Sequence, residues 1–441
     1  MENNFDTIVA IITPLAQGAV GIIRISGDEA FGIARSIFTK EIKPKMINYG
    51  HIKDDNNNIL DEVILLPFVS PHSYTGEDVI EIQTHGSPSI LNSILELILS
   101  KGARLAQRGE FTKRAFLNHR IDLSQAEAVL DVIQSKSEKS AQNALSNLGG
   151  YLKIKINQLK QDLIETYSKV IASIDFPEDV AEVDKNSVVS ICSDKIIQID
   201  DILKNSKSHD FIRDGISACL IGKPNVGKSS LFNSLLNYSR AIVTDIAGTT
   251  RDTIKESINL NGYIINFIDT AGVRDKKDAD IVEQIGIDNS LEAIKESEIV
   301  LFLYESSIDE IDADLIKLSQ DKQVLYVKTK ADLLVGNDEN ILEISSKTGF
   351  GIDKLKDGII SMIKNLIPQD TNYTTNKRQQ TCLIRAKEAL NNVIQTASLD
   401  DLADLYAIDL KQSILALDEI TGEVLTDTIL ENIFDAFCIG K

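Results

Sequence analysis

The chain has 441 residues, 43% of them hydrophobic, and a formal net charge of −20. This length and apolar content are typical of about two to four globular domains and exclude a disordered chain. The excess of acidic residues excludes broad electrostatic capture of nucleic acid, because binding a polyphosphate requires clustered Lys and Arg. The sequence holds no apolar run of about 18 residues and no basic start of a signal peptide, which predicts a cytoplasmic protein without a membrane anchor.

Residues 1–118 alternate short strands with helices, which predicts an α+β domain. Strands are expected at 7–11, 21–26, 62–67 and 79–84, and helices at 29–38 and 89–100. Glu81 lies between Ile80 and Ile82 on the last of these strands, so its side chain points to the opposite face. A solvent-exposed acid is the simplest interpretation of Glu81.

A basic stretch ends this domain and has two interpretations. It contains one acid, Glu110, and the cations Lys101, Arg104, Arg108, Lys113, Arg114 and Arg120. Such a stretch is either a solvated helix face or a binding surface for RNA or another anionic ligand, and the sequence favours neither.

Helical periodicity dominates residues 119–213 and 367–441. In the first segment, one apolar stripe with three- and four-residue spacing comprises Ala141, Ala144, Leu145, Leu148, Leu152, Ile156, Leu159 and Leu163. The second segment carries similar stripes at 384–394 and 405–417. We expect the two segments to form one helical domain with residues 214–366 inserted between them, because the ends of a doubly wound domain can lie close together.

The inserted region begins with a phosphate-binding loop, Gly222-Lys-Pro-Asn-Val-Gly-Lys-Ser229, directly after an apolar run at 216–221. Its two glycines let the backbone curl so that successive N–H groups point at a phosphate. Lys228 would reach the β- and γ-phosphate oxygens, and the Ser229 hydroxyl group can bind Mg2+. The loop predicts chemistry on a nucleoside triphosphate held by Asn225, Val226, Gly227, Lys228, Ser229 and Ser230.

Three further segments indicate guanine and a γ-phosphate sensor. Asp269-Thr270-Ala271-Gly272 ends a predicted strand at 263–268, where the carboxylate can hold the Mg2+ shell and the Gly272 N–H can meet the γ-phosphate. Lys330-Ala-Asp332 follows a predicted strand at 323–327, and its carboxylate can accept from two guanine donors that adenine lacks. Ser345-Ser346-Lys347 follows a predicted strand at 341–344, where a backbone N–H would meet the guanine oxygen. This order at strand ends predicts a doubly wound P-loop GTPase domain.

Two positions depart from the usual GTPase pattern. Thr329 stands where Asn normally contacts the base and ties its loop to the phosphate loop, so we expect weaker nucleotide anchoring with guanine preference retained by Asp332. Val273 stands where many GTPases carry the Gln that orients the attacking water. Charge developing between the β- and γ-phosphates then requires another cation, and Asn225 is a candidate ligand for a monovalent ion such as potassium.

Over nearly its full length the chain resembles the MnmE (TrmE) family of tRNA modification GTPases. The resemblance rests on Asn225, on Thr244-Asp-Ile-Ala-Gly-Thr-Thr-Arg-Asp252 and on Phe437-Cys-Ile-Gly-Lys441. It implies potassium binding by Asn225, Thr244, Ile246 and Thr249, Mg2+ binding by Ser229 and Thr250, and nucleotide contacts by Asp245, Ala247 and Gly248. It also implies that Glu283 orients the hydrolytic water, and a solvated acid on a switch helix is the plain alternative.

The resemblance further implies a folate site in the N-terminal domain. Arg24, Glu81, Arg120 and Lys441 match positions that bind a 5-formyltetrahydrofolate-type cofactor. Glu81 would pair with pterin donors, and the cations would meet the glutamate carboxylates. Cys438 would lie near this site as a candidate catalytic thiol, with a passive thiol on a frayed tail as the alternative. The remaining cysteines, Cys192, Cys219 and Cys382, lie far apart and predict neither a disulfide nor a zinc site.

By the same resemblance, the chain would form a homodimer through its first domain. It would hydrolyse GTP while an aminomethyl-type group is placed on carbon 5 of the wobble uridine of tRNA. Folate would supply the one-carbon unit, and a FAD-containing partner, MnmG (GidA), would carry redox chemistry and much of the tRNA binding. The alternative is a regulatory or ribosome-assembly GTPase switch without modification chemistry, although no KH-like Gly-x-x-Gly signature is clear in the helical segments.

Overall fold

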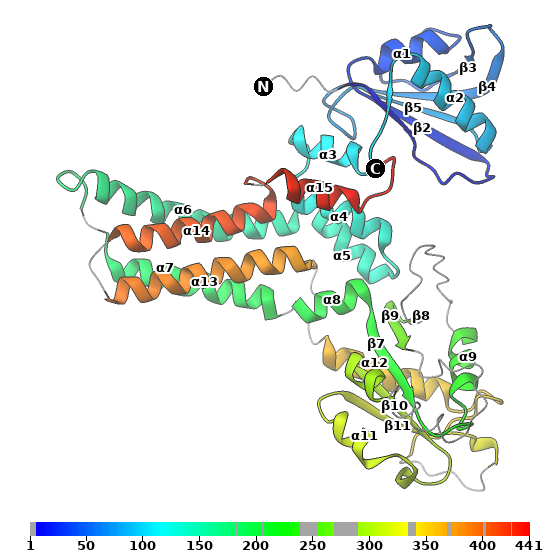
Figure 1. Ribbon diagram of the computed structural model, residues 1–441, viewed down its shortest axis with the longest axis vertical. Coiled ribbons are helices and arrows are strands. Elements are labelled where there is room, and N and C mark those ends of the chain that lie inside the picture. The colour runs from blue at the N-terminus through cyan, green and yellow to red at the C-terminus, as the bar shows by residue number, and fades with distance from the viewer. Residues whose placement is uncertain are drawn as a thin grey trace. The chain divides into compact units, whose positions relative to one another are not determined.

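The computed structural model describes residues 6–181, 183–204, 206–238, 255–268, 290–333, 341–367, 373–399, 403–424 and 426–441. The chain divides into two compact units. One comprises residues 1–130, 148–188 and 388–441, and the other comprises residues 131–147 and 189–387. Figure 1 shows two sheets and a set of long helices, which confirms the predicted multidomain α/β and α fold class.

The N-terminal residues form a six-stranded sheet in the order β3-β4-β5-β2-β1-β6. Its strands are β1 (Ile8–Ile11), β2 (Val20–Ser26), β3 (Asn48–Lys53), β4 (Ile59–Phe68), β5 (Val79–His85) and β6 (Arg104–Leu105). Helices α1 (Ala30–Ile37) and α2 (Pro88–Ser100) pack on this sheet, and their apolar side chains form one core with those of the strands (Figure 1). The sequence did not predict β3, because Asn48 and Gly50 occupy two of its buried positions, where the alternation rule expects apolar side chains.

A short helix, α3 (Glu110–Leu117), follows the sheet and leads into the helical segments. These contain α4 (Leu123–Gln134), α5 (Glu138–Leu148), α6 (Tyr151–Asp175), α7 (Lys185–Lys204), α8 (Ser206–Asp214), α13 (Lys377–Leu399), α14 (Ala403–Thr421) and α15 (Asp427–Asp435). In the first unit α6 packs against α14, where the ammonium group of Lys160 lies 2.6 Å from both Asp418 and Glu423.

The prediction of a single apolar stripe from residue 141 to residue 163 is wrong. The first helix ends at Leu148, and α6 begins after Gly150, which has a left-handed φ of 90°. Glycine adopts this conformation without a steric cost, so the chain can change direction between the two helices. Leu145 is 53% exposed and therefore does not belong to a buried stripe.

The inserted region forms a five-stranded sheet in the order β11-β10-β7-β9-β8 among its described residues. β7 (Ile216–Ile221), β9 (Tyr263–Ile268), β10 (Ile299–Tyr304) and β11 (Gln323–Lys328) are parallel, and β8 (Lys255–Leu260) is antiparallel to β9. Helices α9 (Lys228–Tyr238) and α12 (Ile352–Leu366) contribute to one apolar core of this sheet, and α11 (Ala313–Leu318) contributes to another. Helices on both faces of a mostly parallel sheet are the doubly wound arrangement that the sequence predicted.

The predicted strand at 341–344 is wrong. The segment makes a single parallel bridge, between Glu343 and Lys328, and these two side chains form an ion pair at 3.0 Å. The chain then turns at Ser345, whose N–H donates to the Phe350 carbonyl oxygen at 2.9 Å, so a longer ladder with β11 does not form.

Candidate functional site

The phosphate loop connects β7 to α9. Asn225 and Gly227 have left-handed φ values of 64° and 105°, which curl the backbone within the loop. Gly222 has no room for a side chain, because a Cβ atom there would lie 2.5 Å from the Leu303 carbonyl oxygen. Helix α9 begins at Lys228, so the N–H groups of its first turn lie at the loop.

The side chain of Lys228 lies over its own loop. Its ammonium group donates to the carbonyl oxygens of Gly222 at 2.5 Å and Lys223 at 3.2 Å. Burial lowers the pKa of Lys228, because it penalises the charged form. Both acceptors are neutral, so an anionic phosphate would be a stronger partner for this cation.

Thr329 connects the guanine-selecting segment to the phosphate loop. It lies directly after β11, and its buried hydroxyl group donates to the Val226 carbonyl oxygen at 2.8 Å. Weaker anchoring is expected where Thr replaces Asn, but the hydroxyl group still makes a direct contact between the two loops. The effect on nucleotide affinity stays a prediction.

The carboxylate of Asp332 is oriented by Ser345, which lies in the second guanine-selecting segment. The Ser345 hydroxyl group donates to Asp332 at 2.7 Å and thereby lowers the pKa of Asp332. Ser345 is fully buried, and Ser234 on α9 donates to the neighbouring Ser346 carbonyl oxygen at 3.0 Å. Lys330 adopts a left-handed φ of 57°. The structure therefore brings the two guanine-selecting segments together, and the second of them contacts the middle of α9.

The ion-binding predictions are only partly covered by the described residues. The predicted residues outside them are Thr244, Asp245, Ile246, Ala247, Gly248, Thr249, Thr250, Asp269, Thr270, Ala271, Gly272 and Glu283. Asn225 lies in the phosphate loop, and Ser229 lies with Ser230 in the first turn of α9. Amide and hydroxyl oxygens are ligands of hard cations, so the donor types of Asn225 and Ser229 fit potassium and Mg2+. Within the described ranges, no group of three or more His, Cys, Asp or Glu residues is placed to hold a metal.

A second candidate site lies on the N-terminal sheet. Arg24 on β2 is paired in register with Glu81 on β5, and its guanidinium group donates to the Glu81 carboxylate at 2.8 Å. The interpretation of Glu81 as a solvent-exposed acid is wrong, because its side chain is 16% exposed beside this arginine. Arg24 is only 9% exposed, and its Nη1 atom has no hydrogen-bond partner among the described residues. An unsatisfied buried donor is costly, and a ligand with an acceptor group would relieve that cost.

The C-terminal segment lies at this second site. Phe111 donates its backbone N–H to the Lys441 carbonyl oxygen at 3.2 Å, and Gly109 donates to that of Cys438 at 3.4 Å. Burial lowers the pKa of Lys441, and the nearby Arg24 charge lowers it further. The Cys438 residue is exposed. The tail is therefore tied to the start of α3 rather than frayed.

Arg120, the remaining member of the predicted folate set, contacts Tyr74. Arg120 donates to the Tyr74 carbonyl oxygen at 2.7 Å, and its guanidinium carbon lies 5.3 Å from the centroid of the Tyr74 ring. The guanidinium carbon of Arg24 lies 4.9 Å from the same centroid. The structure thus brings Arg24, Glu81, Arg120 and Lys441 together. The sequence did not single out Tyr74, because one aromatic residue in a loop produces no periodic signal.

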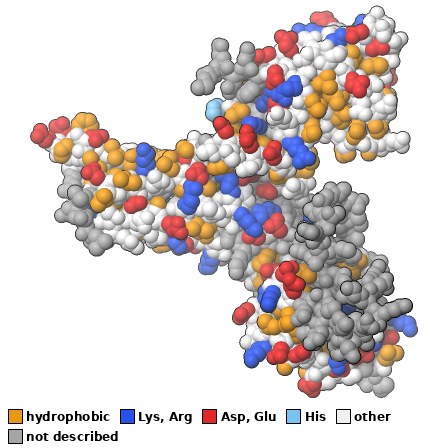
Figure 2. Space-filling view, viewed as in Figure 1, with side chains coloured by type: hydrophobic (Ala, Val, Ile, Leu, Met, Phe, Trp, Pro, Cys, Tyr) orange, Lys and Arg blue, Asp and Glu red, His pale blue; other side chains and the backbone are white. Residues whose placement is uncertain are grey.

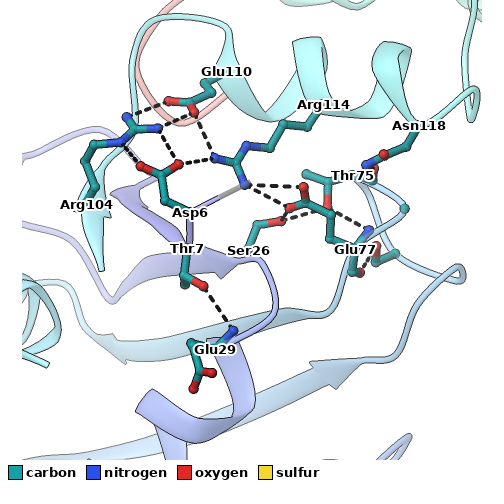
Figure 3. Close-up of polar contacts among 12 residues, drawn as sticks. Asp6, Thr7, Ser26, Glu29, Thr75, Glu77, Arg104, Glu110, Arg114 and Asn118 are labelled. Carbon is teal, nitrogen blue, oxygen red and sulfur yellow. Dashed lines mark hydrogen bonds and ion pairs between the residues drawn. The ribbon is translucent and has the colours of Figure 1, made fainter. Parts of the chain in front are cut away.

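Two arginines of the basic stretch, Arg104 and Arg114, are neutralised within the fold (Figure 3). Arg104 contacts Asp6 at 2.6 Å and Glu110 at 2.7 Å. Arg114 is almost fully buried and contacts Asp6 at 3.2 Å, Glu77 at 3.3 Å and Glu110 at 3.0 Å. Neither interpretation of the stretch, a solvated helix face or a binding surface for an anionic ligand, describes these two arginines, because acids from distant parts of the sequence contact them.

The phosphate loop, the acid segment tied to it and the doubly wound sheet define a P-loop nucleotide-binding protein of the GTPase class, with an α+β domain and helical segments attached. Among the described residues, no helix combines the length and the apolar character that a membrane span requires.

Comparison with known proteins places the chain in one family. The family model of the MnmE helical domain matches residues 123–438, and that of the GTP-binding protein TrmE N-terminus matches residues 7–120. The tRNA modification GTPase MnmE of Streptococcus thermophilus is 41% identical, with 100% of both chains covered. That of Aquifex aeolicus is 40% identical, covering 99% of this chain and 100% of its own. The chain therefore belongs to the MnmE family.

A solved structure, the G domain of the T. maritima FeoB iron transporter, is 25% identical and covers 33% of this chain and 98% of its own, with a TM-score of 0.24.

Proposed function

We propose that this chain uses potassium-dependent GTP hydrolysis to support the modification of carbon 5 of the wobble uridine in tRNA. Its MnmE family membership makes it a GTP-hydrolysing enzyme of tRNA modification. The observation that supports GTP as the nucleotide is the joined geometry of the two loops, in which Thr329 contacts the phosphate loop and Ser345 orients Asp332.

Guanine selection is tested by the substitution Asp332→Asn. An amide cannot accept from both guanine donors, so affinity for GTP should fall by about tenfold or more, while the low affinity for ATP should not fall. Asp353→Asn is the matched control, because Asp353 is exposed on α12. Unchanged GTP affinity in the Asp332 variant would show that this carboxylate does not select the base.

Potassium is proposed to lie between the β- and γ-phosphates, where it would stabilise the negative charge that develops there during hydrolysis. Of the four proposed potassium ligands, Asn225 is among the residues that the structure describes. The other three are Thr244, Ile246 and Thr249. Ser229 and Thr250 are proposed to hold Mg2+, and Glu283 to orient the hydrolytic water. GTP turnover should be much faster in KCl than in NaCl at equal ionic strength, and equal rates would contradict the potassium site.

A 5-formyltetrahydrofolate-type cofactor is proposed for the site around Arg24. Its support is the buried Nη1 atom of Arg24, which has no partner among the described residues, beside the Glu81 carboxylate and two further cations, Arg120 and Lys441. The cations would bind the glutamate carboxylates, and Glu81 would bind pterin donors. Cys438, which lies at the same site, is proposed as a candidate catalytic thiol. Calorimetric titration of the full chain with 5-formyltetrahydrofolate tests this site.

Homodimerisation through the N-terminal domain is proposed from its exposed apolar side chains. Tyr49 on β3 and Ile64 on β4 are cross-strand neighbours and are exposed, as is Val20 on β2. Figure 2 shows hydrophobic side chains gathered over this domain. A second copy of the chain is the proposed occupant of this surface, and sedimentation equilibrium should report twice the chain mass.

A FAD-containing partner, MnmG, is proposed to supply redox chemistry and much of the tRNA contact, which suits an acidic chain with a formal charge of −20. Mass spectrometry of wobble uridine from a deletion strain tests the modification. Loss of the modified nucleoside is expected, and an unchanged profile would favour the regulatory GTPase switch.

A further inference from the structure

Tyr74 lies in the segment between β4 and β5, and two guanidinium groups lie over its ring. The centroid of the ring is 4.9 Å from the guanidinium carbon of Arg24 and 5.3 Å from that of Arg120. Arg24 also lies 5.4 Å from the ring centroid of Phe111 on α3. A cation over the face of an aromatic ring is attracted by the ring's electrons, and this attraction grows as water is excluded.

The segment that carries Tyr74 is fixed on both sides. The Tyr74 hydroxyl group shares a hydrogen bond with the fully buried Thr112 of α3 at 2.8 Å. The next residue, Thr75, contacts the Ser26 hydroxyl group at 2.7 Å, and its carbonyl oxygen accepts from Asn118 at 2.8 Å. Figure 3 shows Thr75 held between these two side chains. The ring position is therefore set before any ligand binds, which reduces the entropy cost of binding.

The charges around the ring are unbalanced in favour of cations. Arg24, Arg120 and Lys441 lie at the site, and Glu81 is the acid that contacts Arg24. The Nε and Nη2 atoms of Arg24 contact Glu81, whereas its buried Nη1 atom has no partner among the described residues. A site of this kind favours an anionic ligand.

We propose that Tyr74 is a positioning residue of this site. It holds the guanidinium groups of Arg24 and Arg120 over one ring, so that both can donate to the carboxylates of the same ligand. This inference rests on the proposed folate function and adds to it a residue that determines how tightly the glutamate portion is bound.

The test is calorimetric titration of the full chain with 5-formyltetrahydrofolate. Tyr74→Leu and Tyr74→Met both remove the ring, and we expect affinity to fall by about tenfold. Tyr74→Phe keeps the ring and loses only the hydroxyl group, so its affinity should stay within about threefold of wild type. Tyr151→Leu is the matched control, because Tyr151 also has a cation, Lys155, 5.9 Å from its ring centroid but lies on α6, outside this site. Thermal unfolding followed by circular dichroism, measured in parallel, reports whether each variant is folded.

A second ligand separates positioning of the arginines from direct stacking on the pterin. 5-Formyl-6-methyltetrahydropterin lacks both the glutamate and the benzoate carboxylate, so removing the Tyr74 ring should leave its affinity unchanged. An equal loss for both ligands would overturn the proposed action through the arginines, and no loss for either would overturn any role of Tyr74. If the wild-type chain binds neither ligand, the folate function itself fails and the Tyr74 proposal fails with it.

Discussion

The hydroxyl group of Thr329 donates to the carbonyl oxygen of Val226 at 2.8 Å, across 103 residues of sequence. The contact joins the segment that selects the base to the loop that binds the phosphates. Thr329 is also buried, and its backbone N–H donates to the Tyr304 carbonyl oxygen at 2.8 Å. One side chain therefore couples the positions of the two ends of the nucleotide site.

Replacing Thr329 by Val should weaken nucleotide binding. Val has nearly the same shape but leaves the Val226 carbonyl oxygen without this donor, and a lost hydrogen bond of this kind costs about 1 kcal/mol. We expect GTP and GDP affinities to fall by about fivefold each, measured by fluorescence titration with labelled nucleotides. Thr329→Ser keeps the hydroxyl group and should bind like wild type; a Ser variant as weak as the Val variant would contradict the role of the hydroxyl group.

Local motifs could be predicted from the sequence, whereas contacts between distant residues could not. The phosphate loop lies within a few residues of Lys228, so its spacing alone indicates its conformation. By contrast, the sequence alone groups Arg104 and Arg114 into a cationic stretch. Asp6 is 98 residues away from Arg104, and nothing in the sequence indicates that the two side chains are in contact. The sequence places residue 329 where a side chain ties its loop to the phosphate loop, but it does not identify the Val226 carbonyl oxygen as the partner.

Arg114 should be the most sensitive position of the ion network in Figure 3. Arg114→Met leaves the carboxylates of Glu77 and Glu110 without their buried cation, and breaking a buried pair in this way costs about 3–5 kcal/mol. Arg104→Met is the control within the same network, because its side chain is 41% exposed and exposed pairs contribute about 1 kcal/mol or less. Urea denaturation followed by circular dichroism measures both, and equal losses would contradict the importance of burial.

The same network should make the N-terminal domain sensitive to acid. Hydrogen bonding to Arg104 lowers the pKa of Asp6. Burial raises the pKa of Glu110, but hydrogen bonds from Arg104, the Gln107 amide and Arg114 outweigh burial and lower it overall. A carboxylate with a lowered folded pKa contributes stability that is present above its unfolded pKa and is lost as the pH falls through the folded value.

Stability should therefore fall steeply below about pH 4, and the fall should be shallower in the Arg114→Met variant. Thermal melts between neutral and acidic pH provide the measurement, and parallel profiles for wild type and variant would contradict this account.

His85 should titrate above the ordinary range of histidine. Its Nδ1 atom lies 2.7 Å from the Asp61 carboxylate, which also accepts the His85 backbone N–H at 2.8 Å. Hydrogen bonding to Asp61 and the charge of Asp61 raise the pKa of His85. Because the folded state binds the proton more tightly, this pair stabilises the fold fully below the unfolded pKa, and the contribution is lost as the pH rises through the raised value.

An NMR titration of the imidazole signals measures this directly, with His85→Gln used to assign the resonance. Asp61→Asn should bring the pKa of His85 back toward its ordinary value. An unchanged titration midpoint in that variant would show that Asp61 is not the cause.

Lys139 on α5 should stabilise the hairpin formed by β8 and β9. Its ammonium group donates to the Tyr263 hydroxyl group at 2.9 Å and lies 4.8 Å from the centroid of the same ring. A second hydrogen bond also holds the hairpin. The side chain of Asn266 on β9 donates to the carbonyl oxygen of Asp214, at the end of α8, at 2.9 Å. Lys139→Met removes the first contact and retains the second, so the hairpin should open locally more often without unfolding the domain.

Amide hydrogen exchange of peptides from residues 255–268 should be about fivefold faster in this variant, which corresponds to a contact of about 1 kcal/mol. Lys155→Met is the matched control, because Lys155 also lies over a tyrosine ring, that of Tyr151, but within α6. That variant should leave exchange in the hairpin unchanged. Tyr263→Leu combined with Lys139→Met should be no faster than Tyr263→Leu alone, since the two side chains act through one contact. Additive effects would mean that Lys139 acts on the hairpin through a different partner.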